Sequence, residues 1–250
     1  MTVTDGTSPT DRRVGEEHPT ANGPLPEFVD WLAGVFIAVG GLLSLVGGSV
    51  SWFVVDNDAL AEGIKEGTIT VGLVTEELTK TETIEVADAV VSWASAGMIA
   101  TGVGMILFAA GYVVSRHRTR RRAGRDGTVG SYGAHAVLGA VATGVLSFIP
   151  LSPGVGGALA GYLECGESER TVSAGALSGL LAMLPFLSVL VFVFGGLITG
   201  LRAVELGGMA TVAGATALFA LAVVAAIGAG LGALGGYAGG RVAESQAGDS

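Results

Sequence analysis

Four long stretches of this sequence contain no charged residue and no histidine, and they limit the fold more than any other feature. They are Trp31–Val55, Ala89–Ser115, Ala174–Leu201 and Leu206–Gly240. A helix needs about 20 apolar residues to cross the roughly 30 Å hydrocarbon core of a bilayer, and each stretch is longer than that. Only 14% of the 250 residues are charged, which is well below the level of soluble domains. The sequence therefore predicts an all-α, multi-pass helical membrane protein.

Aromatic residues mark the ends of the first two stretches. Trp31 and Trp52 flank the first stretch, and Trp93 and Tyr112 flank the second. At 1.5 Å per residue, each pair is separated by about 30 Å of helix, which matches the distance between the two interfacial aromatic belts. We therefore expect a transmembrane hairpin over residues 28–115.

A cluster of arginines after the second stretch predicts the orientation of the hairpin. A short basic segment beside a transmembrane helix stays in the cytoplasm, so residues 116–133 are expected to form a cytoplasmic linker in a cell-membrane protein. The N-terminus is then cytoplasmic as well, and the acidic loop 56–88 is external. Binding to anionic lipid headgroups is a second, compatible interpretation of the cluster. Its members are Arg116, Arg118, Arg120, Arg121, Arg122 and Arg125.

The polar segments carry weaker signals. Residues 1–27 hold four prolines and few apolar residues, so we expect a disordered tail there, and residues 241–250 form a second short tail. Within the external loop, Thr68–Val74 alternates apolar and polar side chains, and Thr81–Val86 could pair with it. That pattern predicts a small β-hairpin leaning on the membrane ends of the helices.

Several classes of protein are disfavoured by composition. The net charge of −9 argues against a nucleic-acid partner. Cys165 is the only cysteine, and the three histidines, His18, His117 and His135, are scattered, so no metal spacing is present. No paired acid, histidine or nucleophile lies at membrane depth. We therefore expect no cofactor, no metal and no enzymatic activity.

Glycine is the most distinctive residue of the chain, with 42 copies. Small residues four apart on a membrane helix form a flat stripe on which another backbone can pack closely. The sequence "GLGALG" at Gly230–Gly235 also fits a dinucleotide-binding pattern, but it lies inside an apolar stretch rather than between a strand and a helix. The predicted helix-packing positions are Gly157, Gly161, Gly175, Gly179, Gly228, Gly232, Gly236 and Gly240, of which the last four form one unbroken register.

A fifth apolar segment, Ala136–Leu163, is interrupted by Pro150 and Pro153. Its two halves are about 21 Å and 15 Å long as helices, so neither crosses a bilayer alone. The segment is either one kinked span or a re-entrant V, and we favour the kinked span. Proline frees backbone carbonyls that lipid cannot satisfy, so we expect the break to face neighbouring helices. Pro185 is a further candidate helix break within the third stretch.

The segment His135–Gly240 resembles a family of uncharacterised, glycine-rich multi-pass membrane proteins from halophilic archaea. The resemblance rests on "VLGAVATGVLSFIPLSPGVGGALAGYLE" (Val137–Glu164), on "AGALSGLLAMLP" (Ala174–Pro185) and on the glycine-rich last stretch. It implies a membrane location and no known activity. Residues 134–240 are accordingly predicted to form a glycine-rich transmembrane module.

Two functions follow from these features. The first is a structural or regulatory membrane protein, which contacts the lipid bilayer and associates with itself or with other membrane helices through the 228–240 glycine stripe. The second is a small-solute transporter or channel with its site at the Pro150/Pro153 break, because broken helices mark substrate sites in transporters.

Overall fold

The computed structural model describes residues 26–55, 57–66, 78–126, 132–164 and 168–248, and these ranges contain helices and no strand. Cys165 and His18 lie outside the described residues. The helices are α1 (Glu27–Val54), α2 (Asn57–Lys65), α3 (Lys80–Asp126), α4 (Tyr132–Val145), α5 (Ser152–Glu164), α6 (Ser168–Ala203) and α7 (Gly207–Gly248).

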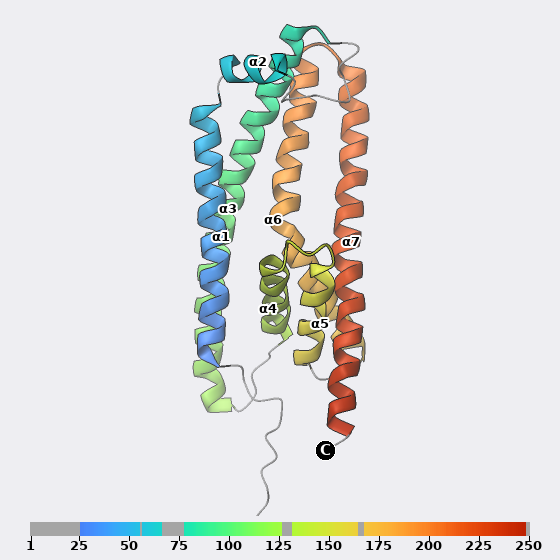
Figure 1. Cartoon of the computed structure of the whole chain (residues 1–250). Coiled ribbons are helices and arrows are strands. Elements are labelled where there is room, and N and C mark those ends of the chain that lie inside the picture. The colour runs from blue at the N-terminus through green and yellow to red at the C-terminus, as the bar shows by residue number, and fades with distance from the viewer. Residues whose placement is uncertain (1–25, 56, 67–77, 127–131, 165–167, 249–250) are drawn as a thin grey trace, which may run out of the picture.

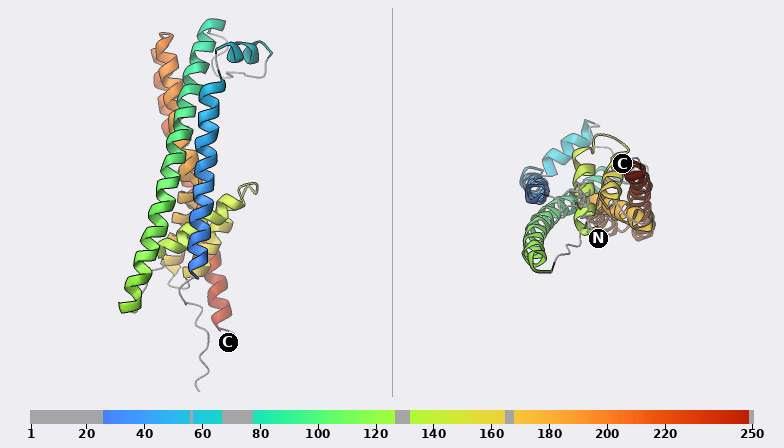
Figure 2. Two further views of the ribbon diagram at one scale, coloured as in Figure 1. Left: turned by 90° about the vertical axis from the view of Figure 1, so that its left-hand side faces the viewer. Right: turned by 90° about the horizontal axis from the view of Figure 1, so that it is seen from below.

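The long helices form an upright bundle of two antiparallel hairpins (Figure 1). α1 packs on α3, α6 packs on α7, and α3 packs on α6, so the two central helices join the hairpins. The short helix α2 lies across the end of the bundle where α1 ends and α3 begins (Figure 2). α1 begins and α7 ends at the opposite end of the bundle, on different sides of it (Figure 1).

The prediction of an all-α, multi-pass membrane protein is confirmed. α1, α3, α6 and α7 are each long and apolar enough to cross a membrane. α3 has 47 residues and is therefore roughly 70 Å long, which exceeds the hydrocarbon core, so its ends extend beyond the bilayer.

The start of α3 corrects the predicted β-hairpin. Thr81–Val86 is helical, because Thr79 and Glu82 form a capping box ahead of it. The Thr79 backbone N–H donates to Glu82 Oε2 at 2.7 Å, and the Glu82 N–H donates to Thr79 Oγ1 at 3.4 Å. This reciprocal pair satisfies backbone donors that a helix start would otherwise leave free. The proposed partner strand, Thr68–Val74, lies outside the described residues.

The α1–α3 interface is built on three glycines spaced seven residues apart. An added Cβ at Gly41 would lie 2.8 Å from the Gly102 carbonyl oxygen, and one at Gly48 would lie 2.8 Å from the Ser95 carbonyl oxygen. At Gly34 it would meet Val113 Cγ2 at 2.5 Å. Positions that repeat every seven residues stay on one side of a helix, so these glycines let α1 approach the α3 backbone along its whole length.

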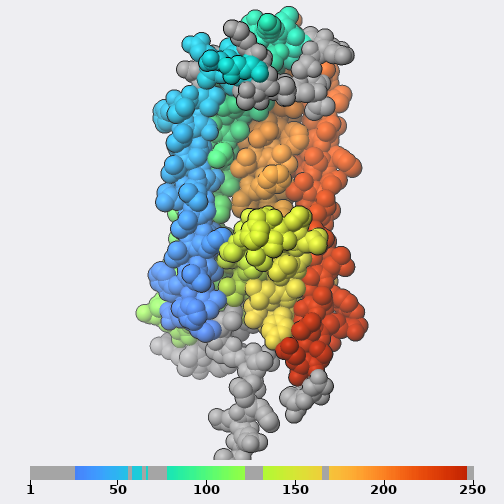
Figure 3. Space-filling view, in the orientation of Figure 1, coloured from blue at the N-terminus to red at the C-terminus, as the bar shows by residue number. Residues whose placement is uncertain are grey.

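The segment expected to be a kinked span turns back on itself, which corrects that prediction. α4 and α5 pack against each other and against α6, and α5 also packs on α7. The two helices form a hairpin that fills the lower half of the bundle between α1 and α7, whereas α6 is visible between those helices in the upper half (Figures 1 and 3). The four long helices are therefore the candidate membrane spans, and α4–α5 forms a re-entrant hairpin within the bundle.

The proline break lies at the tip of this hairpin, where Pro150 is exposed and Pro153 is buried. The prediction that the break is covered by protein is therefore wrong for Pro150 but not for Pro153. Phe148 and Leu151 are 79% and 62% exposed. The two carbonyls that the prolines free accept hydrogen bonds within the turn itself. Ile149 N–H donates to Leu146 O at 2.8 Å, and Ser152 N–H donates to Ile149 O at 3.0 Å. Because these turn bonds replace the lost helical ones, the tip needs no cover from another helix.

The connection between α6 and α7 is short because one residue adopts a left-handed conformation. Glu205 has a φ of 63°, and the following N–H, of Leu206, donates to Leu201 O at 2.9 Å. Such a bond closes the last turn of a helix and reverses the chain. It sets α7 antiparallel to α6, and that alignment brings their glycine series together.

Candidate binding cavity

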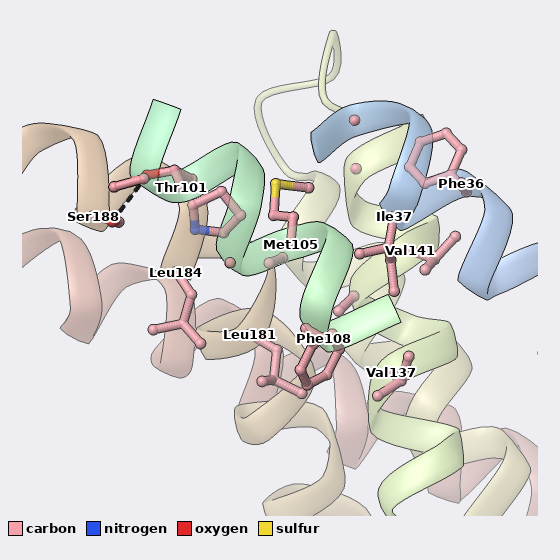
Figure 4. A pocket seen from close by; sticks show the side chains of 17 residues that line it. Phe36, Ile37, Thr101, Met105, Phe108, Val137, Val141, Leu181, Leu184 and Ser188 are labelled. Atoms are coloured by element: carbon pink, nitrogen blue, oxygen red, sulfur yellow. Dashed lines mark hydrogen bonds between the residues drawn. The ribbon is translucent and has the colours of Figure 1, made fainter. Parts of the chain in front are cut away.

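A cavity of about 440 Å³ lies at mid-height in the bundle, between the α1–α3 hairpin and the α4–α7 module (Figure 4). Four helices line it. Phe36 and Ile37 are among the lining residues from α1, Met105 and Phe108 are among those from α3, and α4 and α6 complete the wall. Every lining side chain is uncharged. The volume falls within the range of small-molecule sites, which also favour boundaries between structural units.

The cavity lies among the apolar parts of the long helices. Its α1, α3 and α6 walls come from the interiors of three uncharged stretches that the sequence identified as membrane spans. Phe36, Phe108 and Leu184 line it and also have exposed side chains. The cavity therefore opens toward the apolar outer surface of the bundle.

One part of the wall is polar. The Thr101 hydroxyl of α3 donates to Ser188 Oγ of α6 at 2.9 Å (Figure 4), and both residues line the cavity. Pro185 lines it as well and lies inside α6, which continues through it as a helix. The predicted helix break at Pro185 thus does not end the helix but contributes to the cavity wall.

The four glycines of the 228–240 series face α6 of the same chain. An added Cβ at Gly232 would lie 2.3 Å from the Gly175 carbonyl oxygen, and one at Gly175 would lie 2.3 Å from the Gly232 carbonyl oxygen. One at Gly179 would lie 2.1 Å from the Gly228 carbonyl oxygen. At Gly236 and Gly240 the obstacle is Thr171, which is 2% exposed.

The re-entrant helix α5 covers the neighbouring part of α7. An added Cβ at Gly157 would lie 2.2 Å from the Gly232 carbonyl oxygen, and one at Gly161 would lie 2.2 Å from the Gly236 carbonyl oxygen. The stripe is therefore packed on two sides by helices of the same chain, and its glycines hold the C-terminal module together. Self-association through this stripe stays a prediction.

The end of the bundle that holds the arginine cluster contains a buried ionic site. Asp30 of α1 is 3% exposed. The Tyr112 hydroxyl donates to its Oδ1 at 2.9 Å, Arg116 Nε donates to Oδ2 at 3.2 Å, and Arg120 Nε donates to Oδ2 at 3.1 Å. Two of the predicted topology arginines therefore bind a carboxylate inside the protein, while Arg118 and Arg121 are exposed. The side chains of Arg122 and Arg125 lie outside the described part of the structure.

A second buried pair joins the open ends of the re-entrant hairpin. His135 Nδ1 of α4 lies 2.9 Å from Glu164 Oε2 of α5, and both side chains are 8% exposed. The contact brings residues 29 positions apart in the sequence together, which is feasible only because the segment folds back.

The sequence held signals for both ionic sites that its interpretation missed. Tyr112, Arg116 and Arg120 repeat every four residues and so share one face of a helix. An antiparallel hairpin brings that face to the start of α1, where Asp30 is one of two acids in the first turn. The seven-residue series of Gly34, Gly41 and Gly48 was a comparable signal. The His135–Glu164 pair had no such signal, because it depends on the re-entrant fold.

Taken together, these features define a multi-pass helical membrane protein with an apolar cavity between its helices. Residues 133–242 match DUF5518, a family of unknown function. The match covers less than half of the chain, begins within α4 and ends within α7, so the α1–α3 hairpin lies outside it. It coincides with the segment on which the resemblance to uncharacterised membrane proteins rested. Neither the curated proteins nor the solved structures contain a match.

Proposed function

We propose that this protein is a non-enzymatic membrane protein that takes up a small lipophilic molecule from the bilayer into the central cavity. The observation that carries the proposal is the cavity itself, whose wall is contributed by four helices and is almost entirely apolar. A structural or regulatory role fits its position, because an occupant would contact the α1–α3 hairpin and the α4–α7 module at once.

The packing of the bundle supports an occupant for the cavity. The cavity has a volume of about 440 Å³ and opens to the outside of the bundle, because its lining residues Phe36, Phe108 and Leu184 have exposed side chains. Elsewhere in this chain the helices approach to backbone contact, as at Gly175 and Gly232. Loose packing is therefore not a general property of the bundle, and an occupant accounts best for a space of this size.

Catalysis and ion transport receive less support. The cavity wall carries no ionisable side chain, whereas proton-coupled and ion-coupled carriers usually need one in the membrane. Neither Pro150 nor Pro153, the break proposed as a transporter site, lines the cavity. The observation that favours the transporter alternative is the re-entrant hairpin, since such hairpins also occur in channels and transporters.

The predicted orientation remains part of the proposal. Arg118 and Arg121 are exposed at the end of the bundle where α1 begins, which suits a cytoplasmic location for that end in the cell membrane. With four spans the C-terminus would share that side. Protease protection of tags placed at both termini tests this: cleavage of either tag from outside intact cells would overturn it.

A pair of glycines on α3 provides the test of the cavity. Added Cβ atoms at Gly104 and at Gly111 would both meet nothing within 4 Å, but only Gly104 lines the cavity. Gly104→Phe should therefore fill the cavity, and Gly111→Phe should place the same side chain outside it.

Native mass spectrometry of the protein extracted in mild detergent is the readout. We expect a bound molecule of discrete mass, at one copy per chain, in the wild type and in Gly111→Phe. The Gly104→Phe variant should lose it. An adduct retained equally by all three proteins, or absent from the wild type, would overturn the proposal.

A further inference from the structure

The polar part of the cavity wall specifies what kind of molecule fits. Thr101 is 7% exposed and bonds across the α3–α6 interface to Ser188. Whichever of the two hydroxyls donates in this bond, the Thr101 Oγ1 keeps the capacity to accept a hydrogen bond from an occupant.

Pro185 adds a second acceptor on the same wall. Proline has no N–H, so the carbonyl four residues earlier, at Leu181, lacks its helical donor. Leu181 and Pro185 both line the cavity, and a helical carbonyl points along the axis toward the residue four positions later. The Leu181 carbonyl therefore lies on the face of α6 that borders the cavity. At hydrocarbon depth an acceptor without a donor is costly.

The rest of the wall restricts the occupant further. No lining residue carries a charge, so a charged headgroup would be buried without a partner, at a high cost. A pure hydrocarbon would fill the space but leave the Leu181 carbonyl without a donor. A neutral chain that ends in one hydroxyl satisfies both conditions, because the hydroxyl donates to the wall while the chain contacts the apolar side chains.

We infer that the occupant is a neutral lipid alcohol whose hydroxyl donates to the wall formed by Thr101, Leu181 and Pro185. This inference rests on the proposed function and specifies the ligand class for the same cavity. It explains why a proline is found in the middle of a spanning helix: the proline releases an acceptor at the position where the cavity needs one.

The experiment uses the full chain in nanodiscs and a photoreactive diazirine analogue of 1-dodecanol. Mass spectrometry locates the cross-links, and unlabelled 1-dodecanol and n-dodecane compete at matched membrane concentrations. In the wild type we expect cross-links on the cavity segments of α3 and α6. Dodecanol should compete about three- to tenfold better than dodecane, which corresponds to about one hydrogen bond.

Two variants test the hydrogen bond without closing the cavity. Pro185→Ala returns an N–H to the Leu181 carbonyl, and Thr101→Val removes the hydroxyl with little change in shape. In both variants dodecanol should compete no better than dodecane, and dodecane should still compete as it does in the wild type. Thr199→Val is the matched control, because Thr199 is exposed and donates back to Gly195 O of its own helix at 2.8 Å; its preference should equal that of the wild type.

The outcomes separate this inference from the proposed function. If the cavity is labelled but dodecane competes as well as dodecanol in the wild type, or if the preference survives in both variants, the lipid-alcohol inference is wrong and cavity binding stands. If the wild-type cavity is not labelled at all, both fail. Loss of the preference in Pro185→Ala and Thr101→Val, with the preference kept in Thr199→Val, supports the inference. If one of the two variants folds poorly, the other one still provides the test.

Discussion

Replacing Gly232 by alanine tests whether the glycine series of α7 holds the module together from within. The added methyl group would lie 2.3 Å from the Gly175 carbonyl oxygen and 3.1 Å from Gly179 Cα. Both obstacles belong to the α6 backbone, so no flexible side chain can turn away. α6 and α7 must separate at this level, or α7 must rotate and disturb the contact between Gly236 and α5.

The size of the effect follows from that displacement. Restoring an ordinary contact of about 3.4 Å requires the two backbones to part by about 1 Å, and a gap of 0.5–1 Å forfeits a quarter to a half of the dispersion energy of the atom pairs across it. Overpacked positions typically lose about 1–3 kcal/mol. We expect Gly232→Ala to fall at the upper end of that range, because the neighbouring approaches at Gly228 and Gly236 separate with it.

Gly230 supplies a matched control on the same helix. An added Cβ there would meet nothing within 4 Å, so Gly230→Ala makes the same chemical change without a clash. Alanine also favours the helix by about 1 kcal/mol over glycine. Gly230→Ala should therefore be neutral or slightly stabilising.

The assay is unfolding by sodium dodecyl sulfate titrated into mild detergent, followed by circular dichroism, with the oligomeric state measured by light scattering. Gly232→Ala should unfold at a lower denaturant fraction than the wild type and Gly230→Ala, with no change in stoichiometry. If Gly232→Ala instead alters the oligomeric state and leaves unfolding unchanged, the stripe faces another copy and the reasoning is refuted.

Two further predictions concern the buried ionic sites. Asp30→Ala removes the carboxylate that Arg116 and Arg120 contact, so it should lower the free energy of unfolding by about 3–5 kcal/mol. The control is Glu27→Ala, because the exposed contact of Glu27 with His117 is 3.7 Å long and its loss should change the free energy of unfolding by less than about 1 kcal/mol. Equal effects of the two substitutions in the same unfolding titration would contradict the role given to Asp30. Truncating His135 and Glu164 singly and together should show a coupling free energy of about 0.5–3 kcal/mol in a double-mutant cycle, whereas additive losses would show that the two ends of the re-entrant hairpin are not joined by this pair.

The fold class could be predicted from the sequence because it depends on properties summed along single helices. Uncharged stretches of 25 residues or more have one stable environment, and the bilayer supplies it. The same reasoning identified the close-packing glycines, since small residues four apart occupy one helix face whatever that face contacts.

The partners of those faces could not be predicted in the same way. Gly232 is equally suited to another copy of α7 or to Gly175 of the same chain, and the sequence alone gives no preference. The short α6–α7 turn at Glu205 decides in favour of α6, because it sets the two glycine series antiparallel and in register within one chain. Arg116 and Arg120 likewise fitted a solvated topology signal until the α1–α3 alignment brought Asp30 to them.

The sequence by itself thus determined that this protein is a helical membrane protein, where its spans lie and which helix faces pack closely. Only the tertiary structure decided that Ala136–Leu163 turns back inside the bundle, that its prolines are satisfied by their own turn, and that a cavity remains where α1, α3, α4 and α6 meet. The physical reason is that hydrophobicity and small-residue spacing act within one helix. A re-entrant turn and a cavity depend instead on which helices lie side by side, and contacts between residues far apart in the chain fix that arrangement.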